Sequence, residues 1–172
     1  MASEYLKKAC GIATPRVALL NIGTEEGKGD TLRKEAYPLF KNCKSIHFVG
    51  NMEARELTSG DYDVVACDGF SGNVLIKAAE GTGIGLLKLL KKTFFKSLKN
   101  KIGAFFLKKD IYGIKDFMDY NNYGGAVMLG LKKIVIKGHG SGDSLSVYHC
   151  IEQAYNASKN HLVDCLKDSF KA

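Results

Sequence analysis

Three polar side chains stand in glycine-rich sequence directly after apolar runs, and these residues could do chemistry. Lys28 and His139 each lie between two glycines, and Asn73 follows a segment that contains Gly69 and Gly72. Glycine lets the backbone turn sharply and approach a ligand closely. A cation, an amide and an imidazole in such loops are suited to holding an anion and to stabilising charge that develops in a reaction.

The elements that must position these loops are predicted to be strands and helices in alternation. Strands are expected at residues 16–20, 45–49, 63–66 and 134–137, the second closed by Gly50-Asn51. Helices are expected at 2–11, at 31–42 with Asp30 or Thr31 as its cap, at 73–100 and at 143–170. This alternation predicts an α/β fold with a mostly parallel sheet. Because the carboxyl ends of parallel strands lie at the same edge of a sheet, the three loops are expected to line one phosphate-accepting site.

The predicted site has catalytic and binding residues. The catalytic candidates are Lys28, Asn73 and His139, and the phosphate- or substrate-binding candidates are Asn21, Gly23, Asp68, Gly69, Ser71, Gly72, Gly138, Gly140, Ser141 and Asp143. The exposed N–H groups of helix starts and loops attract anions. Local alternatives stay open: Lys28 as a solvated turn residue, Asn73 as a helix cap, Asp68 as the fixer of its own turn, and His139 as a surface residue.

Composition places the chain among ordinary globular proteins. Its 172 residues fit one domain, with 45% hydrophobic and 25% charged residues. The five cysteines are scattered without metal-ligand spacing, which is typical of a reducing compartment. The first residues show no signal-peptide pattern, and no run reaches the ~18 apolar residues of a spanning helix. We therefore expect a cytoplasmic protein.

Two glycine-rich segments resemble nucleotide-binding loops only superficially. Around Lys28, three residues rather than four separate the glycines, and Gly29 replaces the Ser or Thr that a phosphate loop places on the metal. The segment 138–142 has its third glycine one position too early for the dinucleotide fingerprint. Neither loop predicts a nucleotide site.

The positive charge is concentrated in one predicted helical insertion at about residues 84–109. Between Leu86 and Lys109 there are eight lysines and no acid, whereas the whole chain carries +7. The candidates for docking to a membrane or to a carrier protein are Leu87, Leu90, Lys91, Lys92, Phe94, Phe95 and Leu98. A wide apolar face with lysines suits an anionic membrane surface or an acidic partner. A helix with solvated lysines is the alternative, and nucleic acid is not expected because no nucleic-acid motif is present.

Five segments in order resemble a bacterial family, the acyl-acyl carrier protein:phosphate acyltransferases of phospholipid synthesis. They are 15–29 (with Asn21-Ile22-Gly23-Thr24-Glu25-Glu26-Gly27-Lys28-Gly29), Phe48-Val49-Gly50-Asn51, 64–74, Tyr123-Gly124-Gly125-Ala126 and 136–143. The resemblance implies a three-layer α/β sandwich like that of phosphotransacetylases and of isocitrate and isopropylmalate dehydrogenases. It also implies a homodimer that acts peripherally at the inner face of the membrane, without a metal or other cofactor.

The activity implied by this resemblance is attack of inorganic phosphate on the thioester of a long-chain acyl group on acyl carrier protein, giving acyl phosphate and the free carrier. The family chain is about twice as long, so we expect this sequence to be the carboxy-terminal half. A further departure is Gly142, where similar proteins often carry a second Ser. Two other functions remain: a non-catalytic dimerisation and membrane-anchoring piece, or a short-chain phosphotransacetylase that uses coenzyme A.

Overall fold

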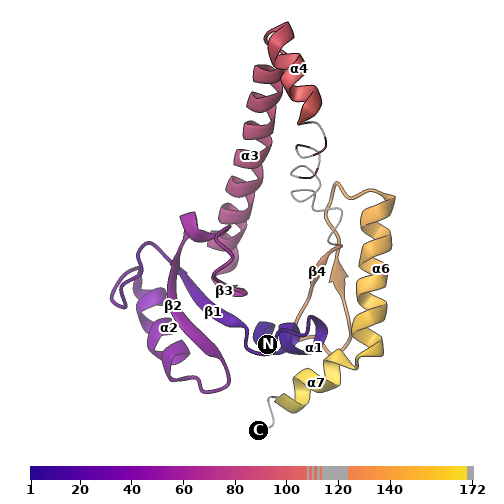
Figure 1. Cartoon of the computed structure of the whole chain (residues 1–172). Coiled ribbons are helices and arrows are strands. Elements are labelled where there is room, and N and C mark those ends of the chain that lie inside the picture. The colour runs from indigo at the N-terminus through magenta and orange to yellow at the C-terminus, as the bar shows by residue number, and fades with distance from the viewer. Residues whose placement is uncertain (108, 110, 112, 114–123, 170–172) are drawn as a thin grey trace. The chain divides into compact units, whose positions relative to one another are not determined.

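The computed structural model describes residues 1–107, 109, 111, 113 and 124–169. The chain divides into two compact units, and most of their elements are labelled in Figure 1. The first unit comprises Met1–Gly69, Ala126–Lys137 and Glu152–Ala172, and the second comprises Phe70–Gly125 and Gly138–Ile151.

A three-stranded parallel sheet is the centre of the first unit. Its strands are β1 (Arg16–Asn21), β2 (His47–Glu53) and β3 (Val64–Ala66), in the order β2-β1-β3. The apolar run 17–20 of β1 is buried throughout, as expected for the middle strand of a parallel sheet. The prediction of an α/β fold with a mostly parallel sheet is confirmed. The carboxyl ends of β1 and β3 are therefore neighbours at one edge.

Helix α2 (Thr31–Asn42) has the bounds that the sequence predicts. The side chain of Asp30 accepts a hydrogen bond from the backbone N–H of Arg33 and so caps the helix. On the side of β2, the ring of Phe48 packs against Tyr37 and Phe40, with centroids 5.2 and 5.5 Å apart. This contact fixes α2 to the sheet (Figure 1).

Strand β2 does not end where the sequence predicts. Gly50 and Asn51 were expected to close it, but the strand continues to Glu53. Gly50 has a φ of +104°, and the register shifts there, since Val17 lies opposite Phe48 while Ala18 lies opposite Gly50. The glycine thus forms a bulge inside the strand instead of a turn after it. As a result, Asn51 is placed within the sheet. The short helix η1 (Ala54–Glu56) follows.

The strand predicted at 134–137 is shorter than expected and belongs to a different sheet. It is β5 (Ile136–Lys137), which pairs antiparallel with β4 (Ala126–Val127) in a two-stranded sheet. The prediction that it joins the parallel sheet is wrong. Consequently the parallel sheet places only two of the three predicted loops at one edge.

The two ends of the chain meet in a second small core. Helix α1 (Ala2–Ala9) contributes Tyr5, and the last helix, α7 (Leu162–Ser169), contributes Leu162 and Leu166. The predicted helix 143–170 is in fact two helices, α6 (Ser144–Lys159) and α7, and residue 170 lies outside the described residues. The break falls at His161, whose φ of 49° is left-handed and incompatible with a continuing helix.

The second unit contains a long helix, α3 (Gly69–Phe94), followed by α4 (Leu98–Phe106). The sequence predicts one continuous helix at 73–100. The predicted start and the predicted continuity of this helix are both wrong. Ser97 ends the continuity because its hydroxyl caps α4 by accepting from the N–H of Asn100. The side chain of Asn100 also donates to the carbonyl of Thr93 at 2.8 Å, which folds α4 back beside the end of α3 (Figure 1).

Candidate functional site

Lys28 lies at the end of a tight turn that follows β1. Its backbone N–H donates to the carbonyl of Glu25 at 3.1 Å. The aliphatic stem of Lys28 crosses directly over Gly23, where an added β-carbon would lie 3.1 Å from Cγ. The Lys28 side chain is 51% exposed, and its Nζ lies 3.9 Å from the carboxylate of Glu25, whose side chain is 67% exposed. A solvated ion pair of this length is weak, so the ammonium group remains available to an incoming anion.

Asn21 ends β1 and holds the far end of the same turn. The side chain is 6% exposed, and its Nδ2 donates to the carbonyl of Lys28 at 3.0 Å. Its Oδ1 accepts from the N–H of Ile22 at 2.8 Å. The sequence predicts Asn21 as a substrate-binding residue. The structure shows that its amide binds the loop that carries Lys28.

Asn51 in β2 holds the beginning of the turn, and sequence reasoning did not select it as a site residue. Its Nδ2 donates to the carbonyl of Glu25 at 2.8 Å. The signals in the sequence are a polar residue after Gly50 in an otherwise extended segment and the place of Asn51 in the family-like segment Phe48-Val49-Gly50-Asn51. The contact itself spans 26 residues and could not be read from local pattern.

An arginine joins the loop after β1 to the loop after β3. Arg33 donates from Nη1 to Asp30 at 2.8 Å, and its Nη2 contacts the carboxylate of Asp68. The Arg33 side chain is 13% exposed, so this ion pair is partly shielded from solvent. Asp68, a predicted binding residue, therefore lies at the same sheet edge as the Lys28 turn. Arg33 was not selected from the sequence.

Cys67, next to Asp68, has the wrong properties for a nucleophile. Desolvation, and secondarily the negative charge of Asp68, raise the pKa of the Cys67 thiol above its ordinary value. The thiol therefore stays protonated near neutral pH, whereas the thiolate is the reactive form.

Asn73 is not the cap of helix α3. The helix begins at Gly69, so Asn73 lies one turn inside it, and the alternative that it caps the helix is wrong. Its side chain is exposed. Gly69, Ser71 and Gly72 belong to the first turn of α3.

The predicted residues 138–143 form a turn before helix α6. The N–H of Gly142 donates to the carbonyl of His139 at 3.0 Å, and Nδ1 of His139 lies 2.8 Å from Oγ of Ser141. Asp143 caps α6, because its Oδ1 accepts from the N–H of Ser146 at 3.0 Å. A β-carbon at Gly142 would lie 2.8 Å from Oγ of the buried Ser146, so a serine here requires Ser146 to move.

The predicted site residues fall into two groups. The first unit holds Asn21, Gly23, Lys28, Asp68 and Gly69. The second unit holds the rest of the predicted catalytic and binding residues, namely Ser71, Gly72, Asn73, Gly138, His139, Gly140, Ser141 and Asp143. That the two groups form one site stays a prediction.

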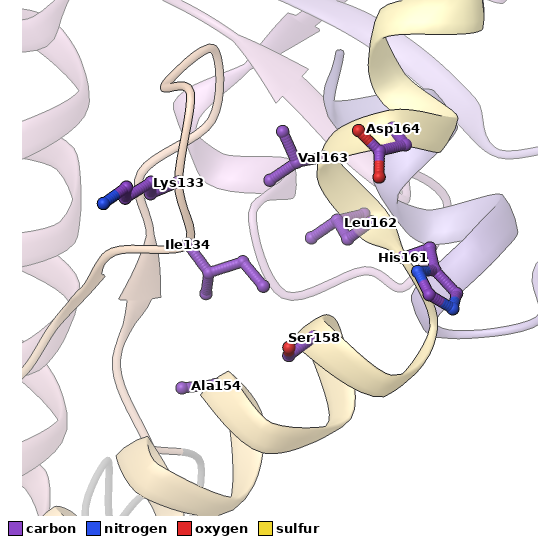
Figure 2. A pocket seen from close by; sticks show the side chains of 8 residues that line it. All are labelled: Lys133, Ile134, Ala154, Ser158, His161, Leu162, Val163 and Asp164. Carbon is purple, nitrogen blue, oxygen red and sulfur yellow. The ribbon is translucent and has the colours of Figure 1, made fainter.

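A hollow of about 370 Å³ lies elsewhere in the first unit, at the junction of α6 and α7 (Figure 2). It is lined by Lys133, Ile134, Ala154, Ser158, His161, Leu162, Val163 and Asp164. None of these is a predicted site residue. The hollow therefore adds nothing to the candidate site.

The end of α3 and helix α4 form a basic and apolar surface, here called the tip. Leu87, Leu90 and Phe94 are half-buried, whereas Phe95 and Leu98 are 64% and 75% exposed. Beyond them, Phe105 and Phe106 are about three-quarters exposed. Lys91 and Lys92 are exposed, and Leu86 to Leu107 includes no acid. No helix among the described residues is long and apolar enough to cross a membrane.

Comparison with known proteins agrees with the motifs around the Lys28 turn. The sequence model of a family described as "Fatty acid synthesis protein" matches residues 1–164. The chain belongs to this family. The resemblance drawn from the motifs is thus confirmed.

Relatives named "Phosphate acyltransferase" match nearly the whole chain. The protein of Streptococcus thermophilus is 52% identical over 171 residues, that of Staphylococcus haemolyticus 47% over 169, and that of Clostridioides difficile 44% over 164. These matches cover 99%, 98% and 95% of this chain but 51%, 52% and 48% of the relatives. The chain spans about half the length of these curated relatives.

Proposed function

We propose that this chain carries the phosphate-binding loops of an acyltransferase that moves a long-chain acyl group from acyl carrier protein to inorganic phosphate. The observation that carries this proposal is the Lys28 turn, where a half-exposed ammonium group is held on a fixed backbone at the carboxyl edge of a parallel sheet. The names of the relatives support phosphate as the acyl acceptor.

The proposed reaction needs positioning more than it needs a base. Inorganic phosphate is largely the hydrogen phosphate dianion near neutral pH and is already nucleophilic. One of its oxygens attacks the thioester carbonyl, the C–S bond breaks, and the proton of the phosphate passes to the departing carrier thiolate. The products are acyl phosphate and the carrier thiol. Holding phosphate beside the thioester supplies most of the rate gain that proximity gives.

The three catalytic candidates and the glycine-rich loops have separate roles in this scheme. Lys28 and the loop amides of 138–142 hold the phosphate, together with the first turn of α3. Asn73 donates to the carbonyl oxygen as it gains negative charge. The imidazole of His139, oriented by its contact with Ser141, guides the proton to the leaving thiol.

The test is an acyl-transfer assay with inorganic phosphate and either palmitoyl-acyl carrier protein or acetyl-coenzyme A. We expect acyl phosphate from the carrier substrate, and a loss of kcat/KM on the order of 100- to 1000-fold in Lys28→Ala. Lys34→Ala is the matched control, since Lys34 is an exposed lysine on α2, and it should leave the rate unchanged. Undiminished transfer by Lys28→Ala would refute the role of Lys28.

The same assay separates the other functions. Transfer from acetyl-coenzyme A alone would identify a short-chain phosphotransacetylase. Transfer from neither donor would favour a non-catalytic module that supplies a homodimer contact and a membrane anchor.

The tip is the proposed docking surface for the membrane or for acyl carrier protein, and the proposal is that the protein acts peripherally at the inner face of the membrane. Exposed aromatic side chains among lysines bind an anionic interface through both apolar burial and charge attraction. Acyl carrier protein is acidic and would be attracted by the same positive charge.

Vesicle binding tests the membrane assignment. We expect salt-sensitive binding to vesicles of phosphatidylglycerol and phosphatidylcholine, weakened about tenfold by Phe95→Ser, because one buried aromatic side chain contributes roughly 1.5–3 kcal/mol. Leu39→Ser, at an exposed leucine on α2, is the control and should bind normally. Equal binding by Phe95→Ser and the unaltered protein would reject the membrane assignment.

A further inference from the structure

Asn51 is a buried polar side chain in a strand that has no local need for one. It is 4% exposed in β2, and its neighbour Met52 is fully buried. Its Nδ2 makes a 2.8 Å hydrogen bond to the carbonyl of Glu25. The orientation of the amide is fixed by chemistry, since a carbonyl only accepts and the atom that faces it must be the NH₂ group.

The other half of this amide is unsatisfied. Oδ1 of Asn51 is buried and has no hydrogen-bond partner among the described residues. A buried acceptor without a partner is destabilising, whereas an apolar side chain of the same shape avoids the penalty. Packing alone therefore does not explain an asparagine here. The hydrogen bond to Glu25 is the contact that an apolar residue could not make.

That bond fixes the first residue of the Lys28 turn. The carbonyl of Glu25 accepts from Asn51 and also from the backbone N–H of Lys28. Asn21 grips the last residue, because its Nδ2 donates to the carbonyl of Lys28 at 3.0 Å. Two amides from adjacent strands thus hold the two ends of one turn. Lys28 itself is left half-exposed, with only a 3.9 Å ion pair to Glu25.

We infer that Asn51 is a positioning residue. It orders the Glu25–Lys28 turn in advance, so that the turn does not have to become ordered when the Lys28 ammonium binds inorganic phosphate. This inference rests on the proposed function. A turn that is already ordered loses less conformational entropy when the anion binds. Asn51 thus acts on phosphate affinity through the backbone and does not touch the substrate.

The test is Asn51→Leu, which keeps the branched shape and removes both polar atoms. We expect three results. Unfolding in urea has the same or a higher midpoint, because the unsatisfied acceptor is gone. The Lys28 amide of the 172-residue chain exchanges its hydrogen at least tenfold faster, since that amide bonds to Glu25. The KM for phosphate rises about tenfold while kcat at saturating phosphate stays within twofold. Met52→Leu is the matched packing control and should leave exchange and KM unchanged.

Each outcome decides something different. Unchanged Lys28 exchange and unchanged KM in Asn51→Leu, with transfer intact, would overturn the inference and leave the proposed function standing. A large fall in the unfolding midpoint together with unchanged Lys28 exchange would also overturn it, because Asn51 would then be a packing residue. Absence of acyl transfer in the unaltered protein would overturn the proposed function, and the Lys28 exchange rate would still decide whether Asn51 orders the turn. Asn51→Ala repeats the exchange measurement if the leucine variant does not fold.

Discussion

The two ends of strand β1 are built in opposite ways. At its amino end, the charge of Arg16 is fully engaged. Its backbone N–H and its Nε both donate to Oδ2 of Asp63, at 2.7 and 2.9 Å, and Nη2 reaches Oδ1 of Asp63 and the carbonyl of Gly60. These hydrogen bonds lower the pKa of Asp63 to about 2. This edge joins β1 to the segment that leads into β3, so its charges stabilise the sheet.

At the carboxyl end, neutral amides do the holding and the charge is left exposed. The side-chain NH₂ groups of Asn21 and Asn51 donate to backbone carbonyls of the loop, and among the described residues Lys28 reaches no carboxylate closer than 3.9 Å. Arg33 and Asp68 are paired beside the loop, so the lysine is the cation that the arrangement presents. Under the proposed function, the charges at one edge of the sheet stabilise the fold, and the charge at the other edge is left to bind an anion.

Gly29→Ala is expected to break the carboxyl edge with the largest effect. Gly29 has a φ of +93°, and a β-carbon there would lie 2.5 Å from Oδ1 of Asn21 and 2.8 Å from Cβ of Arg33. Relief of this clash displaces Asn21 from the Lys28 carbonyl. We expect acyl transfer to fall at least 100-fold and the free energy of unfolding to fall by about 2 kcal/mol.

Gly27→Ala is the matched control in the same loop. A β-carbon at Gly27 meets nothing within 4 Å. Its unfolding free energy should stay within about 0.5 kcal/mol of the unaltered protein. Equal behaviour of the two alanine variants, in the transfer assay and in urea unfolding, would mean that the backbone at Gly29 is not part of what holds Lys28.

Local signals predicted much of this edge, and long-range contacts account for what was missed. The apolar run of β1 and the Asp30 cap of α2 depend only on residues that are close in sequence, and both elements were predicted correctly. Gly50 was misread as the end of β2, because a positive φ serves a bulge as well as a turn. The glycines of α3 do not interrupt the helix, because each costs only about 1 kcal/mol relative to alanine.

The site shows the same division between local and distant information. The position of Lys28 between glycines was readable from the sequence, but its support by Asn51 was not, because strand register decides that contact. The pairing of Arg33 with Asp68 likewise joins residues 35 positions apart. The prediction that the strand at 136–137 joins the parallel sheet was wrong for the same reason, since tertiary structure determines which strand it pairs with.

Asp63→Asn sharpens the comparison from the amino edge, with a smaller effect. The folded pKa of Asp63 is about 2, against an ordinary value near 3.8, because Arg16 stabilises the carboxylate. The stabilisation that the Asp63 carboxylate gives the folded state is therefore present above about pH 4 and is lost as the pH falls toward 2. We expect Asp63→Asn to lower the urea midpoint at pH 5–7, and the difference from the unaltered protein to shrink steadily between pH 4 and 2.

Transfer activity at neutral pH decides whether the two edges are separate. Asp63 lies at the amino edge, away from the loop that follows β1, so Asp63→Asn should leave kcat/KM within twofold. Asp61→Asn, at an exposed carboxylate two residues away, is the control and should show little change in midpoint at any pH. A midpoint difference that persists unchanged at pH 2 would rule out the ion pair as its cause. A loss of transfer as large as that expected of Gly29→Ala would show that the amino edge also positions Lys28, and the division between the edges would fail.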